Sequence, residues 1–235
     1  MAHGHKDFGQ GQEAQIVHQV SDLGELASRL GSPNKFHRGG YVIFQTDFEN
    51  GLNNCDFSSG WPGATYWLTD AETYSGGVAC FLQDMGIDIY TRPIELTKLG
   101  FEIAWIPIDE VDSVEIVIYH DDAVVVRKYR IIISLADEAV KVTDDLGANI
   151  EISDYDFNDP YIVMWQISKL VVDLENEVFD TFYYNDQQFD ISAYEPQEFA
   201  TSGDKRLRCT FSTNPNAMEV SEVIIDNIII TINEP

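Results

Sequence analysis

The chain has 235 residues, 44% of them hydrophobic, which is enough for a packed core and too many for a disordered protein. Its 40 Asp and Glu residues far outnumber its 14 Lys and Arg residues and give a formal net charge of −26. Such a surface repels nucleic acid and anionic membranes, and it favours cationic partners and divalent cations.

Residues 1–20 are polar, rich in glutamine and without a clear period, which predicts an extended arm. This segment lacks the apolar stretch of a secretory signal peptide, and no run in the chain approaches the ~18 apolar residues of a membrane span. We therefore expect a protein that is made in a cytoplasm and has no membrane-inserted segment.

A short helix is predicted directly after the arm. Leu23, Leu26 and Leu30 recur at spacings that place them on one helical face, and Gly31 and Pro33 end the pattern. A helix of about nine residues is not stable alone. Its leucines are therefore expected to dock on the body of the protein or on a neighbouring subunit.

From residue 41 onward, apolar and alternating runs are separated by turn residues, which predicts about twelve strands and no further helix. The predicted strands cover 41–48, 64–70, 78–83, 94–108, 113–120, 124–134, a hairpin over 139–153, 161–174, 177–185, 186–192, 206–213 and 219–233. This pattern predicts an all-β, two-sheet antiparallel sandwich as one domain over residues 38–235, preceded by an arm and helix over residues 1–37.

Two details of this pattern can be tested. Residues 161–174 are expected to pair with residues 177–185, which an Asn185–Asp186 turn connects to the next strand. Gly100 interrupts a long apolar run and is expected to bend that strand.

The three cysteines, Cys55, Cys80 and Cys209, are too widely spaced for a zinc ribbon or a Cys-x-x-Cys redox site. We interpret them as buried free thiols, with a Cys55–Cys80 disulfide as the alternative.

An acidic stretch, EVDSVEI, places Glu110, Asp112 and Glu115 within six positions. Some jelly-roll β-glucanases carry their catalytic carboxylates on a strand written E-x-D-x-x-E, which this stretch resembles. Alternate residues of a strand share a face, so Glu115 lies opposite Asp112 unless a bulge intervenes. With a strand that begins at Ser113, Glu115 takes a half-exposed position. We interpret the three acids as solvated residues at a turn and predict no catalytic residues.

Four segments together carry a broader resemblance: TDFENGL (46–52), SSGWPG (58–63), AETYSGGVACFL (71–82) and VIIDNIIITI (223–232). They resemble the jelly-roll carbohydrate-binding modules and the wider concanavalin-like and galactose-binding-like sandwiches. This resemblance implies a jelly roll whose first and last strands are neighbours.

The same resemblance implies a structural Ca²⁺ between the first and last strands. Its ligands would be Asp47 or Glu49, carbonyl groups near residues 75–77, and Asp226. Ca²⁺ binds six to eight oxygen atoms, and carboxylates and carbonyls supply them. The alternative is that these acids are solvated or cap a loop.

The front of the chain, HGHKDFG (3–9) and the passage over residues 22–51, resembles virion proteins of tailed viruses. Sandwiches of this kind usually work outside cells, and assembly into a virion would reconcile that with a cytoplasmic origin. We therefore predict a non-enzymatic structural protein of a tailed-phage-type particle, in the capsid decoration or the tail. It would dock through residues 1–37 onto other virion proteins and onto itself as a homo-oligomer.

The alternative function is a carbohydrate-binding module, stabilised by Ca²⁺, that recognises cell-surface glycans. Trp61 is the predicted ligand contact, and Tyr66 and Trp67 follow it in or after a glycine-rich loop. Sugar rings stack on exposed aromatic side chains, although such side chains also fill cores. A β-glucanase-like hydrolase is a third reading. The virion and glycan functions are compatible with each other.

Overall fold

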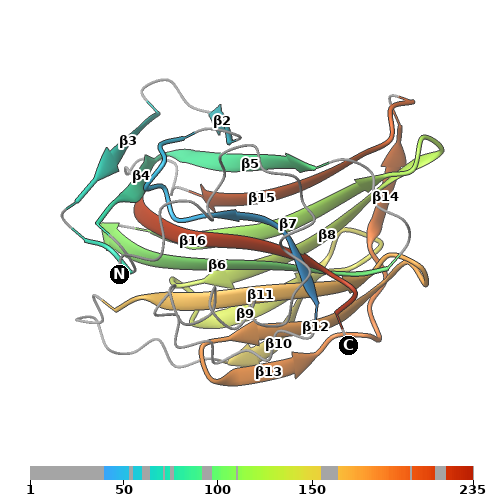
Figure 1. Cartoon of the computed structure of the whole chain (residues 1–235). Helices are drawn as coiled ribbons and strands as arrows, with labels where there is room; N and C mark the ends of the chain where they lie inside the picture. The colour runs from blue at the N-terminus through green and yellow to red at the C-terminus, as the bar shows by residue number, and fades with distance from the viewer. Residues whose placement is uncertain are drawn as a thin grey trace. The chain divides into compact units, whose positions relative to one another are not determined.

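The computed structural model describes residues 40–52, 55–59, 64–70, 72–74, 77–91, 97–109, 111–154, 164–201, 203–214 and 221–234. These residues form strands and turns without a helix, and the strands build two antiparallel sheets (Figure 1). The all-β sandwich prediction is therefore confirmed. The arm and helix predicted for residues 1–37 lie outside the described residues. Within the described ranges, no helix is long and apolar enough to cross a membrane.

The first sheet, sheet A, contains eight described strands. Their order is β13 (Gln187–Asp190), β12 (Val178–Tyr184), β11 (Gln166–Asp173), β6 (Lys98–Asp109), β16 (Glu222–Ile232), β4 (Ala79–Gln83) and β3 (Thr65–Thr69), and β1 (Tyr41–Thr46) pairs with β16. The chain's first and last described strands are thus neighbours, as the resemblance to jelly-roll modules implies.

The second sheet, sheet B, also contains eight described strands. Their order is β10 (Asn149–Asp154), β9 (Ala139–Thr143), β8 (Val125–Ser134), β7 (Ser113–Asp121), β15 (Arg206–Asn214), β5 (Met85–Thr91) and β2 (Asp56–Ser59), and β14 (Gln197–Ala200) pairs with β8.

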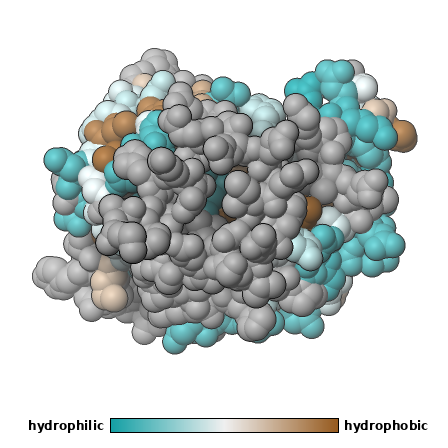
Figure 2. All heavy atoms as spheres, viewed as in Figure 1, coloured by the Kyte–Doolittle hydropathy of each residue, from teal (hydrophilic) through white to brown (hydrophobic). Residues whose placement is uncertain are grey.

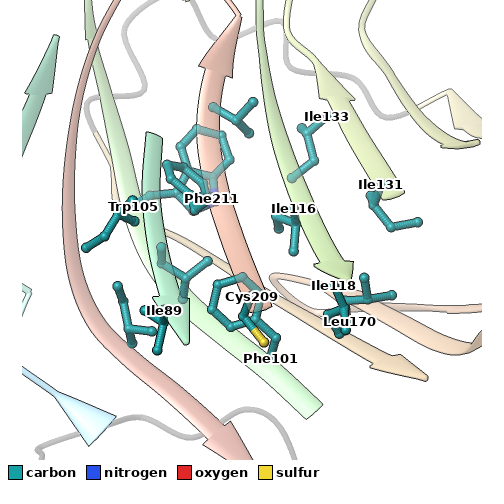
Figure 3. Close-up of a cluster of buried hydrophobic side chains, with 14 of the residues drawn as sticks. Ile89, Phe101, Trp105, Ile116, Ile118, Ile131, Ile133, Leu170, Cys209 and Phe211 are labelled. Atoms are coloured by element: carbon teal, nitrogen blue, oxygen red, sulfur yellow. The ribbon is translucent and has the colours of Figure 1, made fainter. Parts of the chain in front are cut away.

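The inner faces of the two sheets meet in one apolar core, because alternate residues of their strands are hydrophobic. Figure 3 shows this interdigitation, with side chains from β6 and β11 of sheet A facing those from β5, β7, β8 and β15 of sheet B. The labelled residues are Ile89, Phe101, Trp105, Ile116, Ile118, Ile131, Ile133, Leu170, Cys209 and Phe211. Burying each large side chain contributes about 1.5–3 kcal/mol. Trp105 also donates its indole N–H to the Ser168 hydroxyl at 3.0 Å.

The predicted hairpins are confirmed. β11 pairs with β12, and the turn at Asn185 and Asp186 leads into β13. Asn185 adopts φ +52, a conformation that asparagine tolerates better than most residues. The β9–β10 turn is closed by Asp144, whose carboxylate accepts the N–H groups of Leu146 and Ala148.

Three strands differ from the prediction, and one glycine has a packing role. β2, β5 and β14 lie in segments where no strand was predicted. No register shift accompanies the bend predicted at Gly100, because β6 pairs with β11 in unbroken register from Lys98 to Trp105. A Cβ at Gly100 would lie 2.5 Å from the Thr231 hydroxyl and 2.8 Å from Glu234 Oε1, so glycine is required for close packing.

The three cysteines are free, as predicted; Cys80 and Cys209 are buried, whereas Cys55 is only partly buried. Burial raises the pKa of the Cys55 thiol to about 11 and that of Cys80 to about 12, and it also raises the pKa of Cys209. These thiols therefore carry little thiolate at neutral pH and are poor nucleophiles.

The surface agrees with the acidic composition. On the face seen in Figure 2, most described spheres are hydrophilic, and hydrophobic ones gather where Figure 1 places β3 and β4. Exposed apolar side chains on β3 include Trp67 and Leu68.

An ion-pair cluster joins the two sheets at the β7–β8 turn. The Arg127 guanidinium contacts Asp122 at 2.8 Å, Glu177 at 2.8 Å and Glu198 at 3.3 Å. Asp122 also accepts the N–H of Val125 at 2.8 Å. This backbone hydrogen bond and the Arg127 guanidinium hold the pKa of Asp122 well below its usual value.

This depressed pKa makes the turn sensitive to acid. Because the folded pKa of Asp122 lies below its unfolded value of about 3.9, its stabilising contribution is complete above pH ~4 and is lost as the pH falls further. Denaturant titrations from pH 5 to pH 2, in salt that screens the long-range repulsion of the surface, should show a falling midpoint. The fall should be shallower in Asp122→Asn. Parallel curves for the two proteins would contradict this assignment.

Candidate functional site

Five residues singled out in the sequence lie outside the described residues: Leu23, Leu26, Leu30, Trp61 and Glu110. Docking by the leucines and ligand contact by Trp61 therefore stay predictions.

Asp226, one of the predicted calcium ligands, lies where β16 changes its neighbour. Residues 222–225 pair with β4 and residues 228–232 pair with β1, while β6 follows the other edge. The register with β6 shifts between Asp226 and Ile229, and Asn227 has φ +46. A β-bulge thus lies at the point where β1 and β4 diverge.

Glu49 and Asp226 both bind the backbone of the turn that precedes β4. Asp226 is fully buried, and its Oδ2 accepts the N–H of Tyr74 at 3.1 Å. Glu49 Oε1 accepts the N–H groups of Gly77 and Val78, the latter at 3.0 Å. The structure therefore brings two of the three predicted calcium ligands to one turn, as hydrogen-bond acceptors.

The third predicted ligand, Asp47, closes its own local turn by accepting the N–H of Glu49 at 3.2 Å. Within the described part of the chain, no group of three or more His, Cys, Asp or Glu residues could hold a metal ion. Glu49 and Asp226 accept backbone N–H groups, whereas a calcium cage needs several oxygen ligands around the ion. The described residues fit a role as turn staples, and calcium binding stays a prediction.

The acidic stretch follows the predicted alternation. β7 begins at Ser113, and its inward residues Val114, Ile116 and Ile118 are buried in the core. Glu115 faces outward and makes a two-point ion pair with Arg130, with one contact of 3.0 Å. This carboxylate is held by a structural cation, so no glycosidase pair is built around it in the described residues.

The outer face of sheet B carries a row of large polar and aromatic side chains across five strands. Directly paired residues place Tyr90 of β5, Arg208 of β15, Tyr119 of β7, Lys128 of β8 and Gln197 of β14 side by side. Opposite residues of antiparallel strands share a face. At about 4.8 Å per strand the row spans about 19 Å. We call these five residues the sheet B row.

Two cations converge on the central tyrosine of the row. The Arg208 guanidinium lies 3.9 Å from the centre of the Tyr119 ring, and the Lys128 ammonium lies 5.8 Å from it. Burial raises the pKa of Tyr119, and Arg208 opposes that rise. Burial lowers the pKa of Lys128, and Arg130 adds to the lowering. The ring thus holds two partly desolvated cations together by cation–π attraction.

The adjacent row is more tightly packed. Thr210 donates its hydroxyl to Asp88 at 2.5 Å. Val117, which is paired with Thr210 on the neighbouring strand, is buried. Tyr90, by contrast, leaves 44% of its surface exposed. The sheet B row therefore combines an accessible aromatic ring with several hydrogen-bond donors.

A second aromatic pair lies on sheet A. Trp67 is 43% exposed and stacks on Phe81 at 3.9 Å on the face away from the core. Tyr66, which is 42% exposed, points the other way and stacks at 3.7 Å on Phe57, which packs against the core. Trp67 mainly covers Phe81, so it offers a single ring rather than a row.

No protein-family model matches the chain, and no curated protein sequence matches it. Solved structures do share its fold. A carbohydrate esterase from Shiga toxin-encoding bacteriophage phi24B has a TM-score of 0.52 at 12% identity, covering 83% of this chain and 100% of that one. An endo-β-1,4-glucuronan lyase from the fungus Trichoderma reesei has a TM-score of 0.51 at 9% identity, covering 81% and 95%.

The binding domain of a botulinum neurotoxin, solved with rat synaptotagmin II, also matches, with a TM-score of 0.50 at 12% identity over 83% of this chain and 48% of that one. The fold is a jelly-roll-like β-sandwich. At such low identities, these likenesses establish architecture only.

Sequence reasoning found part of this site. It placed Glu115 at a half-exposed position of a strand that begins at Ser113, which is confirmed. It missed Tyr90, which lies in a strand that was not predicted, and it did not single out Arg208 or Lys128. The sequence shows the alternation of residues within each strand. The row depends instead on the register between strands that are far apart in the sequence.

Proposed function

We propose that the protein binds carbohydrate through the outer face of sheet B and does not transform it. The observation that carries this proposal is the sheet B row. An exposed tyrosine stands next to a guanidinium, and an ammonium and a side-chain amide continue the line across neighbouring strands. A sugar offers an apolar ring face for the aromatic side chain and hydroxyl groups for the polar ones.

Two structural neighbours that act on carbohydrates support this proposal. The phage protein is a carbohydrate esterase and the fungal protein is a glucuronan lyase, so the same architecture serves carbohydrate ligands in both. A binding surface on a rigid sheet also needs little reordering, which favours affinity.

Binding without catalysis is proposed because two carboxylates on the outer face of sheet B, Glu115 and Asp88, have structural partners. A retaining glycosidase needs two carboxyl groups about 5–5.5 Å apart, one of them protonated. Glu115 is paired with Arg130, and Asp88 accepts the hydroxyl of Thr210. These contacts fix the two carboxylates as parts of the sheet.

Replacing Tyr90 with alanine should weaken binding of the best ligand on a glycan array about 10- to 100-fold, because an aromatic anchor carries a large share of interface energy. The matched control is Trp67→Ala, since Trp67 is similarly exposed on the other sheet. Affinity can be measured by isothermal titration calorimetry. Loss of binding in Trp67→Ala with retention in Tyr90→Ala would move the site to sheet A, and no binding by the wild type would refute the proposal.

The predicted role in a tailed-phage-type virion rests on residues 1–51, of which only 40–51 are described. Virion assembly, a homo-oligomer and residence in the particle therefore stay predictions. They are compatible with glycan binding, because a particle can present a sandwich that binds cell-surface sugars.

A further inference from the structure

The cations of this protein are scarce, and most described ones are neutralised by a carboxylate. The chain has 14 Lys and Arg residues against 40 Asp and Glu residues. Ion pairs hold the following cations: Lys98, Arg127, Arg130, Lys141, Lys169 and Arg206.

Arg208 and Lys128 differ from these residues. Among the described residues neither has a carboxylate partner, and both instead face the Tyr119 ring. Both side chains are half-buried. In a protein of formal charge −26, two neighbouring half-buried cations without a carboxylate are unexpected, since acids are abundant enough to pair them.

Contact with a ring leaves the hydrogen-bonding capacity of these cations unused. A guanidinium that stacks on an aromatic ring keeps its N–H groups in its own plane, directed to the side. An ammonium has three donors and uses none of them on the ring. The two charges therefore supply several donors around Tyr119.

The local charge balance favours an anion. Lys128, Arg130 and Arg208 stand against Glu115 and Asp88 around Tyr119, and Glu115 is already paired with Arg130. Arg130 and Arg208 both lower the pKa of Lys128, in addition to burial. An anion placed between like charges removes this repulsion.

Resting on the proposed carbohydrate function, we propose that the ligand is an acidic saccharide. A carboxylate or sulfate group of one sugar binds Arg208 and Lys128, and a neighbouring sugar ring lies on the exposed face of Tyr90. Tyr119 is a positioning residue that holds the two cations. Tyr90 and Arg208 are paired across β5 and β15, so ring and anion contacts fall on adjacent strands.

The test is calorimetric titration of the full chain with three probes of similar length: oligogalacturonate, which carries carboxylates, a heparin-derived sulfated oligosaccharide, and neutral xylo-oligosaccharide. We expect an acidic probe to bind at least 10-fold more tightly than the neutral one. Preference between the two acidic probes identifies the anionic group as carboxylate or sulfate.

Arg208→Gln and Lys128→Gln should each weaken the acidic probe about 10- to 100-fold, because hydrogen bonds to charged groups are stronger than neutral ones, and should leave the neutral probe unchanged. Lys98→Gln is the matched control, since it removes the same charge from sheet A, where Lys98 pairs with Asp180. Thermal unfolding confirms that each variant is folded. If Arg208→Gln does not fold, Arg208→Lys keeps the charge, loses the planar fork and should still weaken binding.

Four results would overturn the proposal. Equal affinity for acidic and neutral probes, or unchanged acidic binding in both variants, would leave glycan binding in place and remove the anionic ligand. Tighter binding of a single-stranded DNA oligonucleotide than of any saccharide would show that the ligand is a nucleic acid. Binding of no saccharide would refute the carbohydrate function itself.

Discussion

Replacing Lys169 with methionine is expected to lower the free energy of unfolding by about 3–5 kcal/mol, because it leaves a buried carboxylate without its cation. Lys169 of β11 is 1% exposed, and its Nζ lies 2.8 Å from Glu234 Oε1. Thr231 also donates its hydroxyl to this carboxylate. The pair joins β11 to the residues that follow β16.

Denaturant unfolding of the wild type and three variants measures this effect. The double variant Lys169→Met/Glu234→Gln removes both charges and should recover most of the loss, since neutral side chains of similar size are tolerated in such sites. Lys98→Gln is the exposed control: its pair with Asp180 has exposures of 31% and 25%, and it should cost less than about 1 kcal/mol. A Lys169→Met loss as small as that of Lys98→Gln would show that water reaches the buried pair.

The sandwich could be predicted because its longest strands alternate strongly. In β7 and β8, residues such as Ile116 and Ile131 face the core at every second position, and turn residues mark the ends. β2 and β14 are four-residue strands with few core residues, so their period is too short to detect. β5 contains Gly86, whose missing side chain makes room for Ser212 on the neighbouring strand.

The candidate site could be predicted only in part, because it is a property of register. Its members come from residues 90, 119, 128, 197 and 208, and a shift of one residue in any pairing would move a side chain to the other face. The net charge of the whole chain also gives no indication of a site for an anion. An acidic composition makes anionic partners unfavourable on average, but it does not exclude an anion at Arg208 and Lys128. Salt screens the repulsion between such an anion and acidic side chains that lie farther away than the Debye length.

The junction of β1, β4 and β16 could also be predicted only in part. The resemblance to jelly-roll modules selected Glu49 and Asp226, and the structure brings both to the turn before β4. Both carboxylates accept backbone N–H groups of that turn, and calcium binding there stays a prediction.

Asp226→Ala should therefore destabilise the protein by about 2–5 kcal/mol even in EDTA, because two hydrogen bonds to a fully buried carboxylate are lost. These are the bonds from the N–H of Tyr74 at 3.1 Å and of Asn227 at 2.6 Å. Asp226→Asn is the control, since its amide oxygen still accepts one of them, and it should lose less. Thermal and denaturant unfolding measure both variants.

Adding calcium distinguishes between two roles of the Asp226 carboxylate, as a calcium ligand and as a hydrogen-bond acceptor. If the predicted ion binds, CaCl₂ at 100 times the dissociation constant should stabilise the wild type by about 2.7 kcal/mol, and Asp226→Asn should lose most of that gain. Equal stability of the wild type in CaCl₂ and in EDTA would contradict the calcium prediction and leave the hydrogen bonds as the whole effect. An Asp226→Ala variant as stable as the wild type in EDTA would contradict the staple itself, because the hydrogen bonds from Tyr74 and Asn227 would then contribute no net stability.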